Sequence, residues 1–84
     1  MKNQLGRACL SVMLNIAEGT AKTSSKERRN FYIIARGSVF ESASLIKFLA
    51  SEKEISEGTA RIIFCSFEEI SKMLFAMIKN LTNK

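Results

Sequence analysis

The sequence predicts an all-α protein, an antiparallel up-and-down helical bundle with three long helices. Three observations support this fold class. The 84 residues contain no proline, so no residue forces a helix to break. Hydrophobic residues, 46% of the chain, recur every three or four positions over three long segments. Short stretches rich in serine, threonine, glycine and charge separate these segments, as is typical of turns. We expect residues 1–84 to form a single domain.

The first helix is predicted over about residues 3–18. Its apolar stripe recurs at helical spacing: Leu5, Ala8, Val12 and Ile16. Gly19 follows this stripe, where glycine is typical of a left-handed helix C-cap. Asn15 borders the stripe, which leaves two interpretations open: a solvated edge of the helix, or a hydrogen bond to the next helix.

The second helix is predicted over about residues 25–51. Ser24 followed by Glu27 matches a capping box, the strongest helix-start signal in the chain. Apolar residues lie on two faces of this helix, which indicates either a central position or a contact with a partner subunit. Gly37 lies in mid-helix, where glycine costs about 1 kcal/mol relative to alanine. We therefore expect another helix to approach closely there.

The third helix is predicted over about residues 57–81, with Ser56 as its N-cap. Its apolar stripe follows the three–four spacing: Ile62, Ile63, Phe67, Ile70, Met73, Leu74, Met77, Ile78 and Leu81. The charged residues fall on the complementary face, which we expect to be solvated: Arg61, Glu68, Glu69, Lys72 and Lys79.

The residue inventory argues against an enzyme. There is no histidine, and Cys9 and Cys65 have apolar neighbours without a second ligand at metal spacing, so we expect buried free thiols and neither a metal nor a cofactor. Glu18 and Glu41 could be imagined as an acid–base pair, but no activated nucleophile accompanies them, and structural pairing is favoured. No run of 18 uninterrupted apolar residues exists, so we expect no membrane span and a cytoplasmic protein.

The positive charge is concentrated in the first half of the chain. Residues 1–37 hold seven basic residues and two glutamates, a net of +5, whereas residues 38–84 hold six of each sign. This asymmetry favours an anionic partner such as RNA or DNA. The candidate phosphate-binding residues are Arg7, Lys22, Lys26, Arg28, Arg29 and Arg36.

Two features qualify that hypothesis. Lys26, Arg28 and Arg29 lie near a helix start, where cations oppose the helix dipole, so they either serve binding or form a merely solvated turn. We expect no exposed aromatic array for base stacking, because the phase of Phe31 and Tyr32 favours burial.

Two short strings carry a family resemblance. NIAEG, at residues 15–19, is followed by a basic residue, a Ser-x-x-Glu sequence and then IARGS at residues 34–38. In this order and spacing they resemble the four helix bundle protein family, also called the 23S rRNA intervening-sequence protein family, over about residues 4–81. The resemblance also extends to a related branch, the accessory variability determinant of diversity-generating retroelements.

The resemblance implies a bacterial, basic, non-enzymatic bundle protein that assembles into a homo-oligomer, typically a pentamer. Some members are encoded within intervening sequences of 23S rRNA genes, and the retroelement branch binds a reverse transcriptase and nucleic acid. Family members usually carry another helix before the segment matching Leu5, so the chain resembles a four-helix bundle lacking its first helix. Three explanations stay open: a shortened member, a start that lies upstream, or neighbouring subunits that cover the exposed face. Lys22 stands where arginine is common, and Arg28 and Arg29 replace apolar positions.

Two functional hypotheses follow. The first is a non-enzymatic, oligomeric protein that associates with RNA or DNA through its basic helix-start region. The alternative is an assembly or adaptor subunit that binds a protein partner, such as a reverse-transcriptase accessory protein of a retroelement. In that case the second apolar surfaces form the contacts, and the basic turn serves solubility or partner steering.

Overall fold

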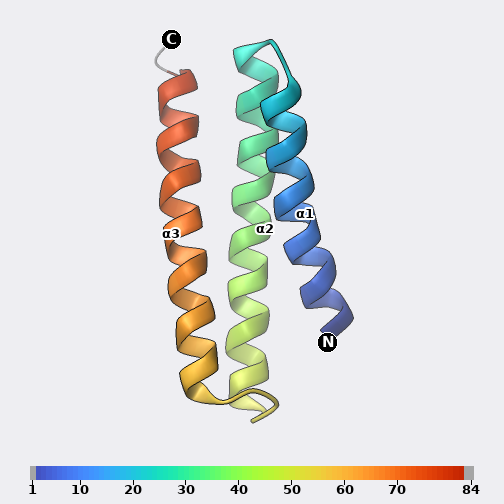
Figure 1. The fold of residues 1–84 in the computed structure, drawn as a ribbon, viewed down its shortest axis with the longest axis vertical. Coiled ribbons are helices and arrows are strands. Elements are labelled where there is room, and N and C mark those ends of the chain that lie inside the picture. The colour runs from blue at the N-terminus through green and yellow to red at the C-terminus, as the bar shows by residue number, and fades with distance from the viewer. Residues whose placement is uncertain (1, 83–84) are drawn as a thin grey trace.

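The computed structural model describes residues 2–82, and the side chains from Asn3 onward. It contains three α-helices, α1 (Lys2–Ala21), α2 (Ser25–Ser51) and α3 (Glu57–Thr82). Successive helices run in opposite directions, joined by two short connections at opposite ends of the molecule (Figure 1). No strand occurs within residues 2–82, so the predicted all-α class is confirmed. The predicted helices agree with the observed ones to within three residues at every end.

The helices form a single layer with α2 in the middle. α2 packs against both neighbours, whereas α1 and α3 do not meet anywhere in the described part of the chain. The molecule measures 44 × 21 × 13 Å, and its radius of gyration is 13.9 Å. A compact domain of this length would have a radius of gyration of about 12 Å. The central position of α2 explains its two apolar faces.

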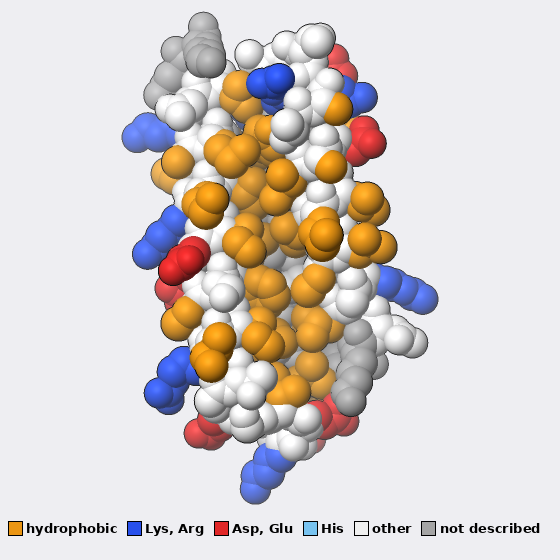
Figure 2. Space-filling model, viewed as in Figure 1, with side chains coloured by type: hydrophobic (Ala, Val, Ile, Leu, Met, Phe, Trp, Pro, Cys, Tyr) orange, Lys and Arg blue, Asp and Glu red, His pale blue; other side chains and the backbone are white. Residues whose placement is uncertain are grey.

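The core follows the line of α2. Its buried members come from all three helices: Val12, Tyr32, Ala35, Val39 and Leu74. Partly buried apolar side chains pack against them, mostly from α3: Ile16, Phe67, Ile70, Met77, Ile78 and Leu81. Figure 2 shows hydrophobic side chains gathered in a column between α1 and α3. One face of the layer therefore presents apolar side chains along most of its length.

Gly19 is not a helix C-cap, so that prediction is wrong. α1 continues past it to Ala21, and none of the described glycines has a positive φ. A Cβ atom at this position would lie 2.7 Å from the ring of Tyr32 and 3.1 Å from the Cβ of Phe31. Gly19 is buried because α1 passes very close to α2 there.

A ladder of small polar side chains joins α1 to α2. The hydroxyl oxygens of Ser11 and Ser38 lie 2.8 Å apart. Asn15 donates to the Ser11 carbonyl oxygen at 2.8 Å and to its hydroxyl at 3.1 Å. Ser42 donates to the Ser38 carbonyl at 2.8 Å. Asn15 therefore supports the α1–α2 contact indirectly, through Ser11, rather than by bonding α2 itself.

The predicted close approach at Gly37 is absent from the described chain. Nothing lies within 4 Å of the position that a Cβ atom would occupy, and the residue is exposed. Ala35 and Ser38, on either side of it in sequence, are the buried residues. Gly37 instead lines an open cavity between α2 and α3, where no other helix comes close to its backbone.

The two connections use recognisable capping geometry. The Ser24 hydroxyl accepts from the backbone N–H of Glu27 at 3.4 Å, which is the serine half of the predicted capping box. At the other end of α2, Lys53 adopts a left-handed conformation with φ 59°. The Ser56 hydroxyl accepts from the Thr59 N–H at 3.1 Å, which confirms the predicted cap of α3.

The cysteines differ from each other. Both are free thiols. Cys9 is half-buried, with its sulfur 4.0 Å from the Ser42 hydroxyl. Cys65 is exposed, so its predicted burial is wrong. It lies nine residues before the buried Leu74, which places it on the opposite side of α3.

Candidate nucleic-acid interface

Four of the six candidate cations lie at the α1–α2 connection. Lys22 directly follows α1, and the capped start of α2 carries the other three: Lys26, Arg28 and Arg29. The capping serine fixes where α2 begins, and so fixes the phase at which each basic side chain leaves the helix. This connection lies at the end of the molecule opposite the N-terminus (Figure 1).

Arg28 is held by the end of α1. Its Nε donates to the carbonyl oxygen of Lys22, and its Nη2 donates to the carbonyl of Thr20 at 3.4 Å. Carbonyl groups at a helix C-terminus lack intrahelical donors and carry the negative end of the helix dipole. The guanidinium therefore satisfies and stabilises the end of α1, in addition to the charge that it contributes.

Lys22 also has partners within the chain. Its Nζ lies 3.9 Å from an Oε2 of Glu18, one helical turn earlier. The same ammonium group lies 5.5 Å from the centre of the Phe31 ring. These contacts direct the side chain along the molecule's own surface.

Lys26 and Arg29 are differently placed. Lys26 is exposed and Arg29 is half-buried, and the described residues offer neither side chain an ion pair or hydrogen bond. Because they are three positions apart on a helix, they project from the same side of α2. They are the two cations of this connection whose side chains have no such partner in the described chain.

The remaining two candidates lie elsewhere. Arg7 is exposed on α1, about 22 Å from Lys22 by the rise of a helix. Arg36 is half-buried between α2 and α3, where its Nε donates to the hydroxyl of Ser71 at 3.2 Å and to its carbonyl at 3.3 Å. The six predicted residues therefore do not form one surface.

Three further cations lie elsewhere between α2 and α3. The sequence predicted that Arg61 and Lys72 are solvated, and it predicted no role for Lys47. Arg61, Lys72 and Lys47 line cavities between α2 and α3, beside Phe64 and Phe40. The spacing of Lys47 from Arg36 and Phe40 was a visible signal, because residues seven and eleven apart share a face of a helix. Only the packing of α2 against α3 shows that these α2 residues lie beside Arg61, Phe64 and Lys72 of α3.

Within residues 2–82, no three histidine, cysteine, aspartate or glutamate side chains gather where they could hold a metal ion. None of the helices in that part of the chain is both long enough and apolar enough to cross a membrane.

The two signature strings meet at the α1–α2 contact. NIAEG supplies Asn15 and Gly19, and IARGS supplies Ala35 and Ser38, all of which lie at or support the close approach of the two helices. Comparison with known proteins found that the family model described as 23S rRNA-intervening sequence protein matches residues 1–76. No curated protein and no solved structure matched. The chain belongs to the 23S rRNA-intervening sequence protein family.

Proposed function

We propose that this protein is a non-enzymatic, cytoplasmic nucleic-acid-associated protein that contacts the phosphates of RNA or DNA through its α1–α2 connection. The observation that carries the proposal is the placement of Lys26 and Arg29 on one side of α2, without an ion-pair partner among the described residues. Lys22 and Arg28 add positive charge beside them. Arg7 and Arg36 contribute to the overall field from other parts of the surface.

The charge balance supports this proposal. The chain carries a net charge of +5, and a single ion pair, Lys22 to Glu18, occurs within residues 2–82. Apart from Lys22, the described basic residues of the first half are therefore not paired with a close carboxylate. Phosphate contacts of this kind give affinity that depends strongly on salt and little on sequence.

The test is a titration of fluorescently labelled structured RNA at several salt concentrations. We expect log K to fall linearly with log salt for the wild-type protein. Lys26→Gln together with Arg29→Gln should lower the slope by about 0.7–0.9 for each phosphate contact that is lost. Lys53→Gln is the matched control, since Lys53 is exposed at the opposite end of α2 and should leave the slope unchanged.

If the double variant and the wild type bind equally well and with equal salt dependence, the α1–α2 connection is not the binding surface. If binding by the wild type does not depend on salt, the protein does not bind through phosphate contacts.

An alternative function is an assembly or adaptor subunit for a protein partner, as in the retroelement branch of the family. It is favoured by the exposure of large apolar side chains, with Ile62, Met13 and Met73 between 64% and 71% exposed. Affinity purification from the native host distinguishes the two. A co-purifying protein with a low 260/280 nm absorbance ratio favours the adaptor, and a high ratio that ribonuclease or deoxyribonuclease lowers favours nucleic acid.

We further infer that the protein forms a homo-oligomer, a pentamer if it follows its family, and that further helices close the layer into a bundle. The support is the apolar column between α1 and α3 in Figure 2. A small domain seldom exposes a continuous apolar face of this kind unless another element covers it.

A further inference from the structure

A continuous groove runs between α2 and α3. It consists of three adjoining cavities of about 310, 360 and 430 Å³. The first and second share Arg36 and Phe40, and the second and third share Phe64 and Glu68. Along α2 the groove extends from Ile33 to Ala50, about 25 Å by the rise of a helix. We call it the α2–α3 groove.

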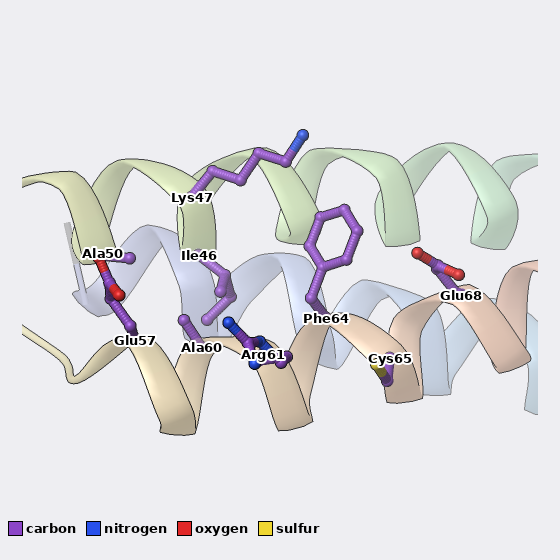
Figure 3. A pocket seen from close by; sticks show the side chains of 9 residues that line it. All are labelled: Ile46, Lys47, Ala50, Glu57, Ala60, Arg61, Phe64, Cys65 and Glu68. Carbon is purple, nitrogen blue, oxygen red and sulfur yellow. The ribbon is translucent and has the colours of Figure 1, made fainter.

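Aromatic rings and cations alternate along this groove. The guanidinium carbon of Arg36 lies 5.1 Å from the centre of the Phe40 ring and 4.9 Å from that of Phe75. Further along, the Nζ of Lys47 lies 5.0 Å from the centre of the Phe64 ring. Figure 3 shows Phe64 projecting from α3 toward α2, with Lys47 on the facing helix. Arg36 and Lys47 are therefore each held beside an aromatic ring.

Two of these rings are unusually accessible. Phe40 is 53% exposed and Phe75 is 51% exposed. A phenylalanine that served only the core would be largely buried. The Arg36 guanidinium lies over both rings, yet each ring keeps solvent-exposed surface that is available for stacking. This contradicts the sequence-based expectation that no exposed aromatic array is present.

The lining of the groove carries a net positive charge, and its charged side chains are not paired with one another. Its lining includes four basic residues and two glutamates: Arg36, Lys47, Arg61, Lys72, Glu57 and Glu68. None of these forms an ion pair with another described residue. Arg36 uses its Nε for Ser71, and its two Nη groups have no acceptor within residues 2–82. They are free to donate to an external anion.

We propose that the α2–α3 groove binds single-stranded RNA or DNA, with bases stacked on Phe40 and Phe75 and phosphates on Arg36, Lys47 and Lys72. Alternating aromatic and cationic groups match a chain in which flat bases alternate with phosphates. An acidic peptide would complement the charge but would lack planar groups for the rings. This inference rests on the proposed function for its ligand class, and it assigns a second surface, separate from the α1–α2 connection.

The first experiment measures fluorescence anisotropy with labelled 20-nucleotide oligo(U), oligo(dT) and an RNA duplex. Phe40→Ala together with Phe75→Ala should weaken binding of the two oligonucleotides about tenfold or more, because stacking on an aromatic side chain contributes that much per base. Binding of the duplex should stay within about twofold, since its bases are already stacked. Leu10→Ala with Leu14→Ala is the matched control, because these side chains are equally exposed on α1.

A second variant reports the contact directly. The chain has no tryptophan, so Phe40→Trp introduces a single indole into the groove while keeping an aromatic surface. Saturating oligo(dT) or oligo(U) should quench its emission, whereas Leu14→Trp should not respond. Circular dichroism checks that each variant remains helical.

The outcomes separate the two proposals. One outcome contradicts binding in the groove but supports the proposed function. In that outcome the Phe40 and Phe75 double variant binds oligonucleotides as the wild type does, and the Lys26 and Arg29 double variant loses binding. A Phe40→Trp emission that does not respond to saturating oligonucleotide likewise overturns the groove. Absence of binding by the wild type to every nucleic acid overturns both. Quenching by one oligonucleotide alone supports the groove and identifies the bound class as RNA or DNA.

Discussion

Gly19 and Gly37 illustrate how differently two glycines in one chain can act. Both lie within helices and both belong to the signature strings of the family. Gly19 is buried where the ring of Tyr32 leaves no space for a Cβ atom. Gly37 is exposed, with nothing within 4 Å of that position. Glycine therefore allows close packing at position 19 in α1, whereas at position 37 in α2 it has no neighbour within 4 Å.

Gly19→Ala should destabilise the protein. The added Cβ would lie 2.7 Å from the Tyr32 ring, and that buried ring has little room to move. Overpacking of this kind costs about 1–3 kcal/mol, which outweighs the gain of about 1 kcal/mol in helix propensity. Thermal unfolding followed by circular dichroism should show a lower Tm, by several degrees for a chain of this size.

Gly37→Ala is the matched control for that experiment. Its Cβ meets no atom, so the variant should gain about 0.5–1 kcal/mol from helix propensity alone. A Tm that rises for Gly19→Ala would contradict the close α1–α2 approach. A Tm that falls for Gly37→Ala would mean that Gly37 contacts another molecule.

At the scale of the element, α2 ends in an unusual way. Glu52 caps the helix, and the backbone N–H groups of Lys53 and Glu54 donate to the carbonyls of Ala50 and Leu49, each at 3.0 Å. This is the bonding pattern of a Schellman motif, in which the residue after the cap is usually glycine. Here that residue is Lys53, at φ 59°.

Lys53→Gly should stabilise the protein. The left-handed conformation costs a residue with a Cβ about 1–2 kcal/mol, whereas glycine loses about 0.5–1 kcal/mol through its greater freedom in the unfolded chain. The net gain should be about 0.5–1 kcal/mol, measured as a higher midpoint of urea unfolding with an unchanged m-value. Lys53→Ala keeps the strain and should show no such gain. Equal midpoints for the glycine and alanine variants would argue against a strained end to α2.

At the scale of the whole molecule, the layer leaves much apolar surface uncovered. Apart from Phe40 and Phe75 in the α2–α3 groove, eight large apolar side chains are between 46% and 71% exposed, distributed over all three helices. Small soluble domains rarely present so much of this surface, because burying it against another chain is favourable. Within the described residues α1 and α3 do not contact each other, so neither helix covers apolar side chains of the other.

We therefore expect the purified protein to be oligomeric. Light scattering coupled to size-exclusion chromatography should give a mass several times the 9.4 kDa of the chain. The Tm should also rise with protein concentration, because association stabilises only the folded state. A well-folded species at the mass of one chain, with a Tm independent of concentration, would contradict this expectation.

Most of the fold could be predicted from the sequence. For the candidate site, the sequence predicted the location of the basic residues but not their contacts. The three helices follow from apolar spacing, and the starts of α2 and α3 follow from Ser24 and Ser56. The basic character of the α1–α2 connection was also visible. The intramolecular roles of Lys22 and Arg28 were not, because their partners, a ring and carbonyl groups, depend on how the chain turns there.

By itself, the sequence determined the properties that depend on neighbours along the chain: helix type, the starts of α2 and α3, the regional charge and the family. These follow from interactions over three or four residues, which spacing and residue type encode directly. The tertiary structure alone decided which glycine is crowded, which cations have partners and which rings stay exposed. The contact of Arg36 with Phe75 spans 39 positions of sequence, and only the packing of α3 against α2 creates it.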